Sequence, residues 1–486
     1  MGTKFYSLVS GVFFVIVAFC VISLVKSTCD NTCNTTVEAY NILFEFYEST
    51  NGEEWSYNLS NTNTTGWNFT GYPSIPNDPC KQCWYGIKCL STESGECSIS
   101  ELNLRETNLT GFLPDSLWNL GLTVLDLEGN DINGSISTNI LDSYQLTKLN
   151  LNDNHLTSTI PMEIFQLPEI RAVYLSYNML MGSIPETIGN ATKLEVLSLN
   201  DNTITGTLPA SLRSLVSLTS IGLDGNNLKG TIADGIFTNL TALVYLNLAY
   251  NSFTGPALGF DGTRSYIPYA IVTVNISSNR FSGSFPAYRN LLNLTYLAVS
   301  SNDLSGTIPS EIGLLSSLEY LFMQDNYKPS GSIPTTLGML RNLKAVVMSN
   351  NNFTGSVVGV FQPELQRQLE CIDISGNTLT GSLPYEFFDL PNIQRITMGK
   401  NCFHGSLPPN ICNATTLEAL LMNSLGGLYG NTVNTTSKNQ FNEFCPSTFR
   451  YQFSIFSTQL TNLAFAMQGS VPSCLFTLPG KPQPTP

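Results

Sequence analysis

The chain has 486 residues, of which only 12% are charged, while Gly contributes 37 residues and Pro 25. So many turn-forming residues and so few charges argue against an ordinary helical enzyme. The formal net charge is −14 and the 22 Lys and Arg residues are scattered, so no basic stripe is available for the phosphates of a nucleic acid.

Residues 1–27 are predicted to be a secretory signal peptide. Lys4 precedes an apolar run from Leu8 to Val25, and Ser27 supplies a small residue at a cleavage point. Because the run covers 18 residues, it could also cross a bilayer, and a signal anchor is the alternative. We therefore expect a secreted or cell-surface protein, with a membrane tether available through this run or through sequence beyond Pro486.

Residues 28–98 are predicted to form a disulfide-bonded unit. Cysteines that crowd together in an exported chain are usually oxidised, and we expect the pairs Cys80–Cys89 and Cys83–Cys97. Cys80-x-x-Cys83 also resembles half of a zinc knuckle, but no second half follows, so no metal is predicted. The cysteines of this segment are Cys29, Cys33, Cys80, Cys83, Cys89 and Cys97.

From Ile99 onward the sequence repeats the pattern L-x-x-L-x-L in steps of mostly 24 residues. Alternating leucines such as Leu125 and Leu127 lie on one face of a short strand. A single coil cannot bury these leucines, but stacked coils can, which predicts a one-dimensional solenoid with a parallel sheet along one side. The copies begin at Leu122, Leu146, Ile170, Leu194, Leu218, Leu243, Ile271, Leu294, Leu318, Leu343, Leu369, Ile393 and Leu417.

An asparagine follows the last leucine of each strand by three positions, as Asn130 follows Leu127. Its amide must be paired, and we expect backbone partners in the same and the next coil. A glycine such as Gly134, followed by Ile-Pro or Leu-Pro, turns the chain back. The asparagine column comprises Asn130, Asn154, Asn178, Asn202, Asn226, Asn251, Asn279, Asn302, Asn326, Asn351, Asn377 and Asn401.

This pattern, L-x-x-L-x-L-x-x-N-x-L-x-G-x-I-P, resembles the plant-type subclass of leucine-rich repeats. About 14 copies cover residues 99–425. The resemblance implies an α/β solenoid, a right-handed superhelix with a parallel β-sheet on the concave face. Loops, short helices or 3-10 turns are then expected on the convex side.

The segments Ala39–Trp55 and Asp78–Cys89 resemble the N-terminal cap of such proteins, an amphipathic helix followed by a disulfide-clasped stretch. The helix is expected to turn Leu43, Phe44, Phe46 and Tyr47 toward the core. The tryptophans of this region are expected in the cap core rather than in a ligand site. They are Trp55, Trp67 and Trp84.

The repeat phase is lost after residue 425. Residues 426–459 are interpreted as an insert, similar in position to the island segments of some plant-type receptors, 460–479 as a degenerate terminal repeat, and 480–486 as a Pro-rich tail. Disulfides are expected at this end too, which leaves Cys371 as the odd cysteine. The cysteines expected to pair here are Cys402, Cys412, Cys445 and Cys474.

The concave face is predicted to bind a partner. Aromatic side chains on adjacent rungs supply contact area at low entropic cost, although aromatic pairs across strands also stabilise a sheet without any ligand. The predicted contact residues are Tyr174, Tyr177, Tyr245, Tyr250, Tyr296, Tyr320 and Phe322.

Asn-x-Ser/Thr triplets predict N-glycosylation and support export. Asn275 lies between strand residues Val274 and Ile276, so a glycan there would obstruct a partner on the concave side. The predicted acceptors are Asn34, Asn58, Asn63, Asn68, Asn108, Asn133, Asn190, Asn239, Asn275, Asn293, Asn352, Asn413 and Asn434.

No catalytic constellation is found, and the chain is predicted to be neither an enzyme nor a cofactor-binding protein. His155 and His404 belong to distant copies and cannot share a site. Asp201 and Asp224 lie on neighbouring rungs, but acidic solvated faces are common, so glycoside hydrolysis is not assigned to them.

The sequence therefore favours a receptor-like, non-enzymatic recognition module whose concave face binds an extracellular protein, peptide or glycan, and neither nucleic acid nor a small-molecule cofactor. The alternative, implied by resemblance to plant polygalacturonase inhibitors, is a secreted inhibitor of a cell-wall hydrolase. An adhesive or structural matrix protein is a third reading.

Overall fold

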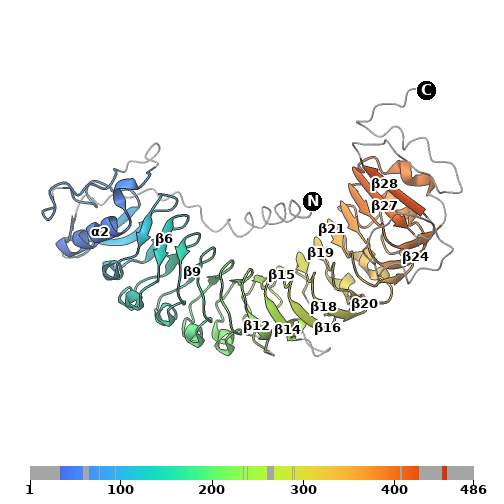
Figure 1. Cartoon of the computed structure of the whole chain (residues 1–486), viewed down its shortest axis with the longest axis horizontal. Coiled ribbons are helices and arrows are strands. Elements are labelled where there is room, and N and C mark those ends of the chain that lie inside the picture. Colours follow the sequence, from blue (N-terminus) through green and yellow to red (C-terminus); the bar gives the residue numbers. More distant parts are fainter. Residues whose placement is uncertain are drawn as a thin grey trace, which may run out of the picture.

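The computed structural model shows a curved solenoid, with helix α2 (Val37–Ser49) near one end and strands β27 (Ala419–Leu425) and β28 (Tyr451–Phe456) at the other (Figure 1). The predicted signal segment, the terminal repeat and the tail lie outside the described residues. The structure describes residues 33–57, 65–75, 77–93, 95–233, 235–237, 239–259, 267–286, 288, 291–404, 408–425 and 451–456.

One long sheet lines the inner side of the curve and has 17 strands within the described ranges. Its rungs are parallel, and their leucines stack in register: Leu102 lies opposite Leu125, and Leu125 opposite Leu149. All three side chains are fully buried, so the predicted solenoid phase is confirmed. The rungs are β3 (Glu96–Asn103), β5 (Val124–Asp126), β7 (Lys148–Asn150), β9 (Ala172–Tyr174), β10 (Val196–Ser198), β11 (Ser220–Gly222), β13 (Tyr245–Asn247), β15 (Thr273–Asn275), β17 (Tyr296–Ala298), β19 (Tyr320–Phe322), β21 (Ala345–Val347), β23 (Cys371–Asp373), β25 (Arg395–Thr397) and β27.

The asparagine column joins each coil to the one before it. Asn154 Nδ2 donates to the carbonyl oxygens of Leu127, 3.0 Å away in the preceding coil, and of Leu151, 3.3 Å away in its own coil. Its Oδ1 accepts from the backbone N–H of Ile132 in the preceding coil, at 3.0 Å. The side chain therefore bonds backward, and the expectation of partners in the next coil was wrong.

Shorter sheets continue from the inner sheet, and 3-10 helices follow them on the outer side of the coils. Proline stands immediately before most of these helices, as Pro209 does before η6, which agrees with the predicted turn at Ile-Pro or Leu-Pro. The strands are β4 (Thr110–Phe112), β6 (Asp131–Gly134), β8 (His155–Leu156), β12 (Lys229–Thr231), β14 (Ser252–Pro256), β16 (Arg280–Ser284), β18 (Asp303–Gly306), β20 (Lys328–Pro329), β22 (Thr354–Gly355), β24 (Thr378–Ser382) and β26 (Cys402–His404).

The outer helices are single turns of 3-10 type rather than α-helices. They are η2 (Asp115–Leu120), η3 (Thr138–Asp142), η4 (Met162–Gln166), η5 (Glu186–Asn190), η6 (Ala210–Ser214), η7 (Ala257–Gly259), η8 (Ser310–Leu314), η9 (Thr335–Met339), η10 (Tyr385–Asp389) and η11 (Pro409–Asn413).

Helix α2 covers the first coil. Thr36 caps it by accepting the N–H of Ala39, and its Leu43 and Phe46 are fully buried, whereas Phe44 and Tyr47 are half-buried. The backbone carbonyl of Ser49 lies against Gly111, where a Cβ would approach it to 2.1 Å. The three cap tryptophans are buried, as predicted; they are Trp55, Trp67 and Trp84. The cap also contains η1 (Gly52–Glu54) and β2 (Ile87–Ser91).

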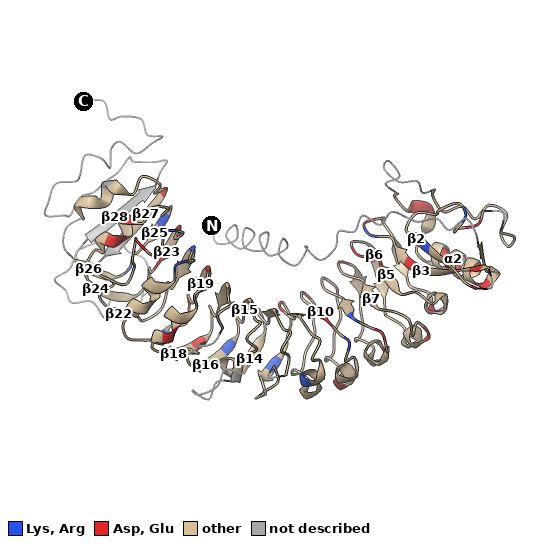
Figure 2. Ribbon diagram, turned by 180° about the vertical axis from the view of Figure 1, so that it is seen from behind, with Lys and Arg blue, Asp and Glu red and all other residues tan. Residues whose placement is uncertain are grey.

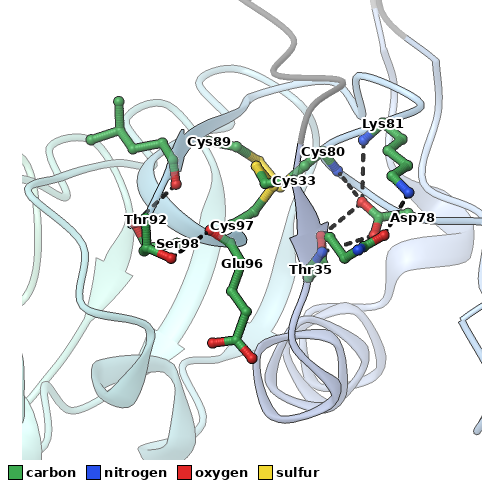
Figure 3. The surroundings of a disulfide bond; sticks show 12 residues. Cys33, Thr35, Asp78, Cys80, Lys81, Cys89, Thr92, Glu96, Cys97 and Ser98 are labelled. Atoms are coloured by element: carbon green, nitrogen blue, oxygen red, sulfur yellow. Dashed lines mark hydrogen bonds between the residues drawn. A yellow bond between two sulfur atoms is a disulfide. The ribbon is translucent and has the colours of Figure 1, made fainter. Parts of the chain in front are cut away.

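The disulfides of the cap are only partly as predicted (Figure 3). Cys80–Cys89 is confirmed, but Cys97 bonds to Cys33 and not to Cys83. The reason is strand β1 (Asn34–Thr35), which pairs in parallel with β3 and places Thr35 opposite Cys97. The Cα atoms of Cys33 and Cys97 are then 5.1 Å apart across a sequence separation of 64.

Asp78 holds strand β1 in place beside these disulfides (Figure 3). Its carboxylate accepts hydrogen bonds from the backbone N–H and the hydroxyl of Thr35, both at 2.8 Å. It also accepts the N–H of Cys80 at 2.9 Å. Cys83 is itself disulfide-bonded, and Cys29 lies outside the described residues.

At the C-terminal end, β28 pairs with β27 in the antiparallel direction. The last six described residues of the predicted insert 426–459 thus belong to the main sheet. Cys402 is disulfide-bonded, while Cys445 and Cys474 lie outside the described residues, as does the side chain of Cys412. Cys371 on β23 is a free thiol, as predicted, and burial raises its pKa to about 11.

Candidate functional site

Each rung from β3 to β25 is followed by a corner residue with a left-handed backbone. It stands immediately before the column asparagine, or before Thr107 in the first coil. Ten different copies hold a non-glycine residue there, including Tyr177 at φ 55° and Tyr250 at φ 51°. These two tyrosines are 45% and 51% exposed. The corner residues are Glu106, Gly129, Asp153, Tyr177, Asp201, Gly225, Tyr250, Ser278, Ser301, Asp325, Asn350, Gly376 and Lys400.

Four residues on the consecutive rungs β9, β10, β11 and β13 form what we term the acidic–aromatic patch: Tyr177, Asp201, Asp224 and Tyr250. Their backbones are directly linked, since Asp201 N–H donates to Asp224 O at 2.8 Å. Burial, together with the neighbouring charges of Asp201 and Asp224, raises the pKa of the Tyr177 hydroxyl to about 12. Rungs lie about 4.8 Å apart, so the tyrosines frame two carboxylates over roughly 14 Å.

Gly225 brings the two carboxylates of the patch together. It occupies the corner of the rung that carries Asp224, and a Cβ there would lie 2.4 Å from Oδ1 of Asp201. A side chain at this corner would push the Asp201 carboxylate away. The glycine therefore provides the room in which Asp201 approaches the Asp224 rung.

The patch carries negative charge without a basic partner. Burial, together with the Asp201 charge, raises the pKa of Asp224 to about 7, and burial also raises the pKa of Asp201. Within the described residues, neither carboxylate forms an ion pair with a basic side chain. Asp201 is exposed, as expected for a solvated acidic face, whereas Asp224 is half-buried.

The other predicted aromatics behave differently, and we term Tyr296, Tyr320 and Phe322 the aromatic cluster. Tyr296 is only 7% exposed, because its ring packs against those of Tyr320 at 6.1 Å and Phe322 at 5.5 Å between centroids. The expectation that Tyr296 is an exposed contact residue was therefore wrong. Lys344 Nζ already lies 5.8 Å from the centre of the Tyr320 ring and pairs with Glu319 at 2.7 Å.

Tyr174 on β9 and Tyr245 on β13 lie on the concave sheet, and both are half-buried. Lys148 Nζ lies 5.8 Å from the Tyr174 ring centre and pairs with Asp126 at 2.7 Å. The Tyr245 hydroxyl accepts from Asn247 at 3.2 Å, and burial beside Asp224 raises its pKa to about 12. Tyr245 thus borders the acidic–aromatic patch, whereas Tyr174 already has a cation over its ring.

Among the described glycan acceptors, Asn34 lies on β1 and Asn275 on β15 of the long sheet. Asn275 on β15 is half-buried, and its Oδ1 accepts the N–H of Ser277 at 3.1 Å. Asn58, Asn63 and Asn434 lie outside the described residues. The exposed acceptors are Asn34, Asn68, Asn108, Asn133, Asn190, Asn239, Asn293, Asn352 and Asn413.

Charges are distributed along the whole solenoid (Figure 2). His155 lies 3.4 Å from Asp131 at an exposed position, distant along the chain from His404. Among the described residues, no group of three His, Cys, Asp or Glu side chains is arranged to hold a metal ion. The described helices are all too short or too polar to cross a membrane.

The chain is a leucine-rich repeat protein of the plant type with a disulfide-bonded N-terminal cap. The family described as Leucine Rich Repeat matches residues 98–120, 145–167, 193–215, 293–315 and 368–390, and the solenoid carries the same repeat through the intervening coils.

Its relatives are receptor-like proteins. Receptor-like protein 39 of Arabidopsis thaliana is 29% identical over 150 residues, which cover 30% of this chain and 17% of that protein. Receptor like protein 28 of the same plant is 28% identical over 183 residues, 37% of this chain and 19% of that protein. The chain thus spans less than a fifth of the length of either relative.

Solved structures of receptors are also similar to this chain. The plant peptide hormone receptor RGFR1 in complex with RGF2 superposes with a TM-score of 0.57 and 31% identity, over 65% of this chain and 53% of that one. A TDR receptor superposes with a TM-score of 0.52 and 25% identity, over 67% of this chain and 63% of that one.

Proposed function

We propose that this chain is a receptor-like extracellular recognition module that binds a peptide or protein through its concave face and catalyses no reaction. The observation that carries the proposal is the pair of exposed tyrosines, Tyr177 and Tyr250, which follow strands of a sheet whose other described aromatic side chains are partly or fully buried. Large aromatic side chains left in water on a rigid surface are typical binding anchors.

Export is part of the proposal. The Cys33–Cys97 and Cys80–Cys89 disulfides require an oxidising compartment, and nine predicted glycan acceptors are exposed. The similarity to RGFR1, solved with RGF2, favours a peptide ligand, and the relatives are receptor-like proteins. We place the protein at the cell surface or in the extracellular space.

Partner capture tests the proposal. The glycosylated chain, immobilised on beads, is incubated with secreted proteins and peptides from its own source, and bound species are identified by mass spectrometry. We expect a stoichiometric partner that is lost with Tyr250→Ser. Tyr385→Ser is the matched control, because Tyr385 is 53% exposed and lies on the outer helix η10.

A partner that both variants retain, or the absence of any stoichiometric partner, contradicts the proposal. The second outcome would favour a structural matrix protein. Tyr320→Ser measures whether the half-buried part of the aromatic cluster also takes part, since Tyr320 is less exposed than Tyr250.

A further inference from the structure

The concave face between β9 and β13 lacks positive charge of its own. No Lys or Arg occurs in strands β10, β11, β13, β15, β17 and β19 or in the three residues after each of them. Arg171 and Lys193, which precede β9 and β10, are paired with Glu195 and Glu169 at 2.7 and 2.6 Å. Asp201 and Asp224 therefore face the concave side without a counter-charge.

The same sheet also carries a buried hydrogen-bond acceptor without a partner, three rungs beyond β13. It is Oε1 of Gln324, which lies two residues after the end of β19. Gln324 occupies the same repeat position as Asp224, the first residue after the last core residue of its strand. Buried acceptors without donors are costly, so such a surface favours an occupant that brings donors and positive charge.

We propose that the acidic–aromatic patch docks a basic segment of a peptide, with an arginine or lysine side chain placed between Tyr177 and Tyr250 and paired with Asp201 and Asp224. This inference rests on the proposed function and specifies its partner. A guanidinium group bonds two carboxylate oxygens at once and stacks on tyrosine rings, so both features of the patch suit it.

Two other places on the same sheet support the choice of occupant. Lys344 of this chain lies beside Tyr320 and pairs with Glu319, and Lys148 does the same for Tyr174 and Asp126. The chain thus twice builds an arrangement of aromatic ring, lysine and carboxylate. Among the described residues, no Lys or Arg pairs with Asp201 or Asp224.

A selection experiment with a defined probe tests the inference. Random twelve-residue peptides displayed on phage are selected on the immobilised, glycosylated full chain, and the Arg and Lys content of the enriched pool is compared with the input. An extended peptide of this length exceeds the roughly 14 Å of the patch. We expect about threefold enrichment of basic residues with the wild type, and none with the double variant D201N/D224N.

The chain carries a net charge of −14, so a control must separate local recognition from general attraction. The double variant D115N/D142N removes the same charge from exposed positions on η2 and η3. It should enrich basic peptides as the wild type does. Far-UV circular dichroism checks that both variants fold.

The best arginine peptide is then resynthesised with citrulline, which has the same shape without the charge. We expect about tenfold weaker binding to the wild type and no difference with D201N/D224N. Enrichment of neutral or acidic peptides, or equal enrichment with D201N/D224N, overturns the inference, as does equal binding of the citrulline peptide. If the captured partner is nevertheless lost with Tyr250→Ser, the proposed function stands and only its basic ligand is wrong.

Discussion

The acidic–aromatic patch and the aromatic cluster both place tyrosines on rungs of the same sheet, yet only the patch leaves its tyrosines about half exposed. In the aromatic cluster, Tyr296 is covered by its neighbours and Tyr320 has a lysine beside its ring. In the patch, Tyr177 and Tyr250 occupy corner positions, and small residues separate them. The position within the repeat and the neighbouring rungs therefore both decide burial, since Tyr245 is half-buried at the strand position where Tyr296 is only 7% exposed.

The largest expected difference concerns stability. Tyr296→Ala should lower the free energy of unfolding by about 3 kcal/mol, because the ring is buried against those of Tyr320 and Phe322. Tyr250→Ala should change it by no more than about 0.5 kcal/mol, because that ring is half in water. Urea denaturation followed by circular dichroism measures both free energies of unfolding. Equal losses would show that the ring of Tyr296 is no better packed than that of Tyr250.

Asp224 should make the patch sensitive to pH. Its pKa is raised from 3.8 to about 7 in the folded chain, so the unfolded chain holds fewer protons between these values and stability falls as pH rises through this window. Asp224→Asn should remove that fall and raise stability at pH 8 by about 1 to 2 kcal/mol, after allowance for screening by water.

At pH 3.5 wild type and Asp224→Asn should unfold at the same urea concentration, because both are then neutral at this position. Asp142→Asn, at an exposed position, should follow the wild type throughout. The groups that interact with Asp224 are Asp201, Tyr177 and Tyr245, and the tyrosines stay protonated over this range. A wild-type curve that rises between pH 4 and 7 would contradict the assignment to Asp224.

Gly225 allows a smaller and more local test. Gly225→Ala places a Cβ at φ +65° and 2.4 Å from Oδ1 of Asp201, so it should cost about 2 kcal/mol at most and displace that carboxylate. Gly121→Ala has a similar φ of +71° with nothing within 4 Å, so it measures the backbone strain alone, about 1 kcal/mol. Equal losses in urea denaturation would mean that Asp201 does not need the space over Gly225.

The smallest effect is expected at the cation of the aromatic cluster. Lys344→Met should lower the free energy of unfolding by at most about 0.5 kcal/mol, because both partners of the Lys344–Glu319 pair are a third exposed. High salt should reduce the difference between the two urea midpoints. A loss above about 2 kcal/mol would show that the cation holds the cluster together.

The coil phase could be predicted because it depends on local sequence alone. Leucine spacing sets the strand faces, and the asparagine recurs wherever a coil must bond to its neighbour. The direction of that bond could not be predicted, since the repeat pattern is the same toward both neighbouring coils, and only the structure shows that Asn154 bonds to the preceding one. The Cys33–Cys97 bond was missed because it depends on β1 joining a strand 64 residues away.

The candidate site was predictable only in part, for the same reason. Tyr177 and Tyr250 stand out in sequence as aromatic residues next to the column asparagine, and the structure leaves both exposed. The sequence around Tyr296 does not predict that rings from the following rung cover its side chain. The raised pKa of Asp224 could not be predicted, because it depends on burial in the folded solenoid and on the charge of Asp201 in the preceding coil.

The left-handed corner has a consequence for how such a surface can change. Backbone hydrogen bonds and the asparagine column hold this turn, and glutamate, glycine, aspartate, tyrosine, serine, asparagine and lysine all occupy it in one chain. The scaffold therefore accepts several residue types at this position, at a similar conformational cost of about 1 kcal/mol. Evolution or protein engineering can change the exposed side chains of this edge one coil at a time while the solenoid backbone is kept.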